Sequence, residues 1–125
     1  MTSAEWIEAA RIRLEAATVL LENNYPADAL TRAYFAVFSA GKALLHNRGL
    51  TAKTHRGTHT LIHKHLREDI DTALLRSLQE EREDCDYRLL RPSTSKVNRR
   101  LEQTQSFIEA AKEMTSSEED DESLG

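Results

Sequence analysis

The chain has 125 residues, 39% hydrophobic and 30% charged, which is ordinary for a soluble helical protein with one core. Its single cysteine, Cys85, excludes an internal disulfide framework and a CxxC metal motif, and 4 glycines with 2 prolines leave little turn chemistry for hairpins. The net charge is −4, but an EEDDE run at 118–122 accounts for it, so the total is weak evidence against an RNA partner.

The first predicted helix runs from an N-cap at Ser3 to about Asn23. One apolar stripe steps along it by three and four residues: Ile7, Ala10, Leu14, Ala17 and Leu21. Charged residues such as Glu5, Glu8 and Arg11 interrupt the N-terminal segment, which therefore has no apolar signal core. We expect a cytoplasmic protein.

The central predicted helix covers 26–48 and begins with Pro26, whose missing N–H costs nothing at a first helical position. Gly49 suits the left-handed residue after its last turn. Large apolar residues recur at helical spacing, with small ones between them: Leu30, Tyr34, Val37, Phe38, Leu44 and Leu45. Apolar character on most sides indicates a helix at the centre of a bundle. Charges within it, such as Arg32 and Lys42, argue against a membrane span.

Three further helices follow: a short one within 56–66, one from about 69 or 71 to 89, and one over about 95–114. The residues expected to face inward are Leu61, Ile62, Leu66, Ile70, Leu74, Leu78, Cys85, Leu89, Val97, Leu101, Thr104, Ile108 and Ala111. Thr94 or Ser95 could cap the last helix.

The predicted fold class is therefore all-α, an antiparallel four-helix bundle with one additional short helix. Residues 1–114 form this domain. Residues 115–125 are predicted to be a disordered acidic tail, because they cannot bury enough apolar surface to offset chain entropy. The tail either solubilises the chain or mimics the charge of nucleic acid.

The most informative polar residues are Arg82 and Asp86, which continue the apolar row of the fourth predicted helix by one turn each. They could form a partly buried ion pair that closes the bundle or a dimer contact. Alternatively, Asp86 holds Arg82, with Tyr87 alongside, to grip phosphate in a cleft. Arg88 and Arg91 would add positive potential nearby.

A second group lies in KTHRGTHTLIHKHL, where His55, His59 and His63 recur every four residues. Two such histidines can clamp Zn²⁺, but no HExxH carboxylate or nearby cysteine completes the site. A solvated mixed-charge face is one alternative, and a basic anion-binding patch with Lys53, Arg56 and Lys64 is another. We predict no metal site and no cofactor.

Three motifs appear in order: the run from Tyr25 to Leu45, a KTHxG loop at 53–57, and an RxxxDY signature made by Arg82, Asp86 and Tyr87. Together they resemble the HEPN domain, in particular its small stand-alone prokaryotic members. The resemblance covers about residues 4–112. It implies a helical bundle that dimerises, and a partner protein that is a minimal nucleotidyltransferase, as in toxin–antitoxin pairs.

Many HEPN proteins are metal-independent ribonucleases whose site, built across the dimer, has an arginine followed four to six residues later by a histidine. By this resemblance the catalytic candidates are Arg82, Asp86 and Tyr87, and the candidates for binding RNA or nucleotide are Lys53, His55, Arg56 and Arg88. However, no histidine follows His65, so the usual acid–base partner is missing.

Two functions remain open: RNA or nucleotide binding near Arg82, with or without cleavage, and a non-catalytic helical module that binds a nucleotidyltransferase partner. A third class, a four-helix metal carrier, would require inward Glu and His pairs that the sequence does not offer.

Overall fold

The computed structural model describes the backbone of residues 1–124 and the side chains of residues 1–116. Its described part consists of five helices without a strand: α1 (Ser3–Glu22), α2 (Pro26–Asn47), α3 (His55–Leu66), α4 (Thr72–Arg88) and α5 (Thr94–Leu124). The prediction of an all-α bundle with one shorter helix is confirmed.

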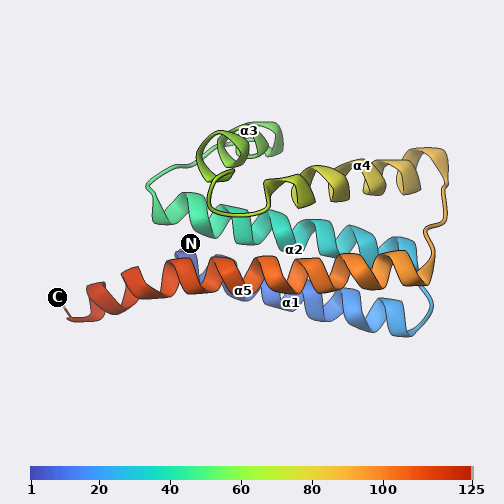
Figure 1. The fold of residues 1–125 in the computed structure, drawn as a ribbon, viewed down its shortest axis with the longest axis horizontal. Helices are drawn as coiled ribbons and strands as arrows, with labels where there is room; N and C mark the ends of the chain where they lie inside the picture. Colours follow the sequence, from blue (N-terminus) through green and yellow to red (C-terminus); the bar gives the residue numbers. More distant parts are fainter. Residues whose placement is uncertain (125) are drawn as a thin grey trace.

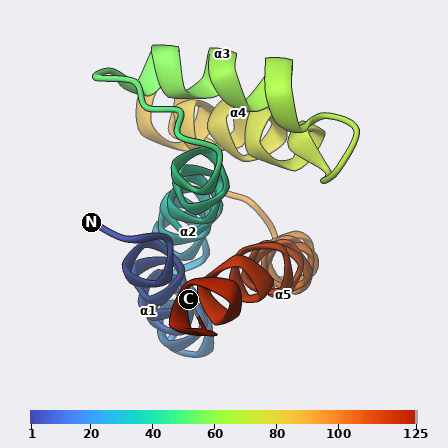
Figure 2. The same ribbon diagram turned by 90° about the vertical axis from the view of Figure 1, so that its left-hand side faces the viewer.

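Helix α2 lies at the centre of this arrangement, between two layers (Figures 1 and 2). Helices α1 and α5 pack along one side of α2, and α3 and α4 cover the opposite side. Helix α3 is seen almost end-on in Figure 1, so it lies across the direction of the long helices. Each layer therefore covers a part of the apolar surface of α2.

Thirteen residues of α2 are buried: Ala29, Leu30, Ala33, Tyr34, Ala36, Val37, Phe38, Ser39, Ala40, Gly41, Ala43, Leu44 and Leu45. The small residues among them allow neighbouring helices to approach closely, and the large ones supply most of the apolar area removed from water. The cap after α2 is as predicted: Arg48 ends the helix, and Gly49 has a φ of 72°.

The N-cap of α1 lies one residue before the predicted cap, Ser3. Thr2 is the N-cap, and it forms a capping box with Glu5, whose carboxylate accepts a hydrogen bond from the Thr2 N–H at 3.0 Å. Ser3 instead lies inside the helix, buried, and its hydroxyl donates to the Ala43 carbonyl at 3.2 Å. The predicted cap thus ties α1 to α2.

Helix α4 ends at Arg88, and the prediction that Leu89 is buried is wrong, because its side chain is 82% exposed. Leu89 is the C-cap in a left-handed conformation, with φ of 53°, which turns it away from the apolar row of the helix. Of the other residues of α4 that were predicted to face inward, Leu74 and Leu78 are buried and Cys85 is half-buried.

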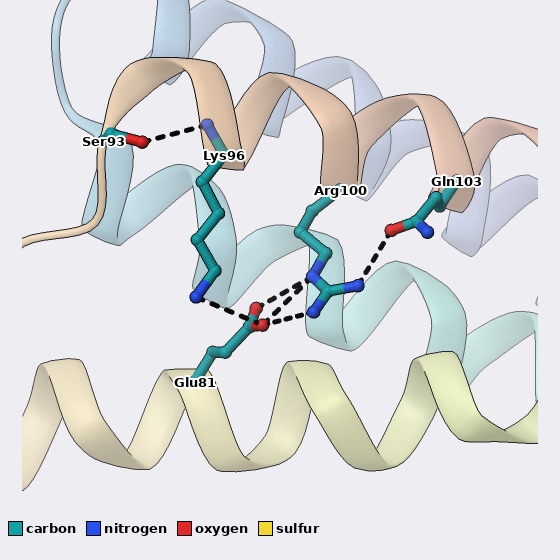
Figure 3. A network of polar contacts seen from close by, with 5 residues as sticks. All are labelled: Glu81, Ser93, Lys96, Arg100 and Gln103. Atoms are coloured by element: carbon teal, nitrogen blue, oxygen red, sulfur yellow. Dashed lines mark hydrogen bonds and ion pairs between the residues drawn. The ribbon is translucent and has the colours of Figure 1, made fainter.

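An ion-pair network joins α4 to α5 (Figure 3). Glu81 accepts two hydrogen bonds from the Arg100 Nε, at 3.1 and 3.0 Å, and a further one from the Arg100 Nη2. Lys96 lies 3.6 Å from the same carboxylate. The side chains of Glu81 and Arg100 are only 15% and 22% exposed, so water screens this pair less than a surface pair.

Helix α5 begins at Thr94, where Ser93 rather than Thr94 or Ser95 provides the cap by accepting from the Lys96 N–H at 3.1 Å. The helix continues beyond residue 114, to Leu124, and Thr115 is buried. The acidic side chains of 118–122 lie outside the described residues, so a disordered tail over 115–125 stays a prediction. No helix of the described part is long and apolar enough to cross a membrane.

The contact between α2 and α3 gives a first prediction. A Cβ atom at Gly41 would meet the Ile62 Cδ1 at 2.6 Å, and Ile62→Val removes that atom. Gly41→Ala gains about 1 kcal/mol of helix propensity but must displace Ile62. We expect Gly41→Ala to be more favourable by about 0.5–3 kcal/mol in the Ile62→Val background than alone, as measured by urea unfolding. Equal effects in both backgrounds would contradict this close packing.

The ion-pair network gives a second prediction. Arg100→Met leaves the Glu81 carboxylate without its forked partner, and we expect the free energy of unfolding to fall by about 1–3 kcal/mol. Arg99→Met is the matched control, because Arg99 is exposed on the same helix and forms no ion pair among the described residues. Its effect should stay within about 0.5 kcal/mol. If both variants melt alike, the network does not stabilise the bundle.

Candidate functional site

Arg82 is half-buried on α4 and packs on aromatic rings of α2. Its guanidinium carbon lies 4.7 Å from the centroid of the Tyr34 ring and 5.4 Å from that of the Phe35 ring. Such cation–π contacts contribute about 1–2 kcal/mol when partly shielded from water. Tyr34 and Phe35 of α2 therefore position the guanidinium of Arg82.

The predicted ion pair between Arg82 and Asp86 is not found among the described residues. Asp86 is exposed, one turn further along α4. Helical side chains lean toward the N-terminus, and an arginine preceding an acid by four residues is the less favourable order for pairing. The aromatic rings of α2 offer Arg82 an alternative contact that Asp86 cannot match.

Arg82 keeps an unsatisfied hydrogen-bonding group. Its Nε is buried and has no hydrogen-bond partner in the described part of the chain. The Gln79 Oε1, one turn earlier on α4, is also buried without a partner. An unpaired buried polar atom costs about 1–3 kcal/mol, so both atoms mark a place where a ligand or a second chain could add a bond.

Tyr34 also contacts α3. Its hydroxyl lies 2.8 Å from the His59 Nε2, and the two rings are roughly parallel, with centroids 5.9 Å apart. Burial raises the pKa of Tyr34 above its ordinary value, so its hydroxyl stays protonated at neutral pH. One buried ring thus connects His59 of α3 with Arg82 of α4.

His55 is exposed and stacks on Phe38, with ring centroids 4.3 Å apart. Its ring is also nearly perpendicular to that of Phe35, with centroids 6.2 Å apart, so Phe35 contacts both His55 and Arg82. The histidines at 55 and 59 therefore pack on aromatic rings of α2. No group of three or more His, Cys, Asp or Glu residues able to hold a metal ion occurs in the described part.

The remaining candidate residues are exposed to solvent or lie apart from the contacts of Arg82, His55 and His59 with α2. Tyr87 is 81% exposed, and Arg88 pairs with Asp84 at 2.8 Å near the end of α4. Lys53 and Arg56 are exposed around the start of α3. The hollows described on the surface, such as one of about 470 Å³ beside Lys96 and Arg99, are not lined by Arg82. The cleft expected beside Arg82 is therefore not one of these hollows.

Sequence reasoning placed Tyr34 and Phe38 in the core and His59 in a row of histidines, but it did not join them to Arg82. Two spacings in the sequence could have predicted this contact: YFxxF on α2 and HxxxH on α3. Both put rings on one helix face at i and i+4, and two such faces pack ring against ring when their helices cross.

Comparison of the sequence with known proteins identifies its family. Residues 3–117 match the family described as the HEPN domain. A protein of Methanocaldococcus jannaschii named "Putative toxin MJ0605" is 29% identical over 111 residues, which cover 85% of this chain and 83% of that protein. The match includes every candidate residue on α2, α3 and α4.

The half-buried imidazole of His59 gives a third prediction. Burial is the main cause that lowers the pKa of His59, and nearby His63, His55 and Arg82 lower it further. The unfolded chain therefore binds more protons than the folded one between the depressed pKa and about 6.5. Stability is complete above about pH 6.5 and is lost as the pH falls toward the folded pKa of His59.

We expect His59→Gln, whose amide oxygen can still accept from Tyr34, to lose less stability between pH 7.5 and 5.5 than the parent chain does. Melting temperatures at the two pH values measure the difference. His65→Gln is the control, since the side chain of His65 takes no part in the cluster. A pH dependence identical in parent and His59→Gln would contradict a half-buried His59 whose pKa is lowered in the folded chain.

Proposed function

This chain belongs to the HEPN family, and we propose that it acts as the toxin of a pair with a minimal nucleotidyltransferase and binds phosphate groups of RNA or a nucleotide around Arg82. The name of its archaeal relative supports the toxin role. We expect a cytoplasmic homodimer that needs no cofactor, with the binding face completed where two copies meet.

A single observation carries the proposal: Arg82 forms no ion pair among the described residues and still has a buried Nε without a partner. A half-buried guanidinium normally has a carboxylate or carbonyl to compensate its desolvation. Here two aromatic rings hold it in place and leave its donors free. A phosphate, which matches the planar fork of a guanidinium, would compensate this charge through the terminal nitrogens of Arg82, which are not among the buried unpaired atoms.

Asp86, Tyr87 and Arg88 stay candidates for contacts that form only with RNA or the second copy, because they are exposed near the end of α4. Lys53, His55 and Arg56 are further candidates for contacts with the RNA backbone from the start of α3. Cleavage would need a proton-transfer group that α4 lacks, since no histidine follows Arg82. The proposal is therefore for binding, and cleavage is a separate outcome of the same assay.

The fourth prediction concerns Arg82→Met, which keeps an unbranched apolar side chain on Tyr34 and removes the charge. The loss of a charged contact to phosphate, about 1.5–3 kcal/mol, weakens binding by about tenfold or more. Fluorescence anisotropy with an unstructured, labelled oligoribonucleotide measures it, at fixed salt because phosphate contacts depend on salt.

Arg99→Met is again the matched control, with the same change of charge at an exposed position of α5, and we expect a loss below about threefold. Incubating the same samples with EDTA, followed by gel electrophoresis, reports any metal-independent cleavage. Equal affinity of the parent and Arg82→Met for the oligoribonucleotide would overturn the proposal.

A second candidate function, a non-catalytic module that holds the nucleotidyltransferase, is favoured by exposed apolar side chains near the end of α4. Tyr87, Leu89 and Leu90 are 81%, 82% and 54% exposed. Contiguous apolar side chains in water are typical of protein interfaces. This function predicts that Leu89→Ser/Leu90→Ser releases a co-expressed partner, whereas Arg82→Met does not.

A further inference from the structure

His59 and Arg82 come from different helices, yet the same buried side chain holds both. Tyr34 is 1% exposed, its ring supports the Arg82 guanidinium at 4.7 Å, and its hydroxyl bonds the His59 Nε2 at 2.8 Å. Neither the sequence motif nor the family match gives His59 a role. The imidazole of His59 and the proposed phosphate-binding arginine nevertheless contact the same tyrosine.

The hydrogen bond to Tyr34 selects the tautomer of His59. The Tyr34 hydroxyl hydrogen has no other acceptor among the described residues, so it satisfies both groups best by donating to Nε2. The proton of a neutral imidazole then lies on Nδ1. Nδ1 has no partner among the described residues and is not among the buried unpaired atoms, so solvent reaches it. The same holds for the terminal nitrogens of Arg82.

The charges around His59 oppose a second positive charge in the free protein. His55 and His63 face it from α3 and Arg82 from α4, and all three lower its pKa in addition to the effect of burial. Glu83 of α4 acts in the opposite sense, and Tyr34 of α2 is neutral. A bound phosphate would reverse this balance, because a nearby anion favours the imidazolium.

We propose that His59 and Arg82 donate to the same phosphate group, that Tyr34 fixes the imidazole for this purpose, and that phosphate binding brings one proton from solvent onto His59. This inference rests on the proposed function at Arg82 and adds its second donor. When His59 is protonated, the direction of its hydrogen bond with Tyr34 reverses, and Nε2–H donates to the hydroxyl oxygen. The Nδ1–H continues to donate to the phosphate. No covalent bond to phosphorus forms or breaks.

The test uses the full chain and an unstructured oligoribonucleotide with hydroxyl ends, whose phosphodiesters do not titrate near neutrality. Dissociation constants are measured from pH 5.5 to 8.5, and titration calorimetry in two buffers of different ionisation enthalpy counts the protons taken up. For the parent chain, binding should tighten by up to about tenfold per pH unit as the pH falls across the window, with proton uptake approaching one.

His59→Gln should bind several-fold more weakly at low pH, with a flatter pH profile and a smaller proton uptake. His65→Gln should keep the parent profile. A second set of measurements uses adenosine monophosphate as the ligand. Its terminal phosphate has a second pKa of about 6, so its own titration adds to the pH dependence of binding. This addition distinguishes a terminal phosphate of a nucleotide from the phosphodiesters of RNA. Tyr34→Phe, which keeps the ring under Arg82, should lower the affinity without unfolding the chain.

The outcomes separate the two proposals. Arg82-dependent RNA binding with equal pH profiles and proton uptake in parent and His59→Gln would overturn the role of His59 and leave the proposed function intact. Binding that does not depend on Arg82, or no binding at all, would overturn both. If His59→Gln is misfolded by circular dichroism, His59→Asn and the proton count of the parent chain decide, and an uptake near zero overturns the inference.

Discussion

Burial of α2 on nearly all sides is the constraint on which the rest of this structure depends. A helix with buried residues around most of its circumference needs neighbours on two opposite sides, and the two layers of Figure 2 provide them. The small residues of α2 allow close approach, as the 2.6 Å distance at Gly41 illustrates. Tyr34 and Phe38 could not be buried without α3 and α4 above them. The candidate site is therefore a consequence of core packing.

This origin explains why the site contains aromatic rings, histidines and an arginine rather than a cavity lined by acids. The layer of α3 and α4 must cover Tyr34, Phe35 and Phe38, and planar polar groups can do this while keeping one edge in water. His55, His59 and Arg82 each stack on a ring of α2. A guanidinium held in this way needs no carboxylate for its position, which leaves its charge available to an anion.

Periodicity was sufficient to predict most of the fold, because the apolar spacing of each helix is regular and turn residues separate the helices. Prediction failed where a single backbone conformation decides the outcome. Leu89 follows Cys85 by four residues, yet a left-handed cap turns it outward. For the caps at Thr2 and Ser93, neighbouring residues of similar chemistry compete for one position. Such choices depend on tertiary contacts, for example that of Ser3 with Ala43, which are not visible in local sequence.

For Arg82, the candidate named from the sequence, the structure shows a different contact from the predicted one. The motif named Arg82 as a candidate, and helical spacing alone paired it with Asp86, an opposite charge one turn further along the same helix. The structure pairs it with α2 instead, because contacts between helices can outweigh an exposed i,i+4 ion pair of about 0.5 kcal/mol. His59 could not be joined to Arg82 before the crossing of α3 over α2 was known. An acid–base or binding group that a motif lacks within its own helix can therefore come from a neighbouring one, and the ring between them, here Tyr34, is the residue that brings the two together.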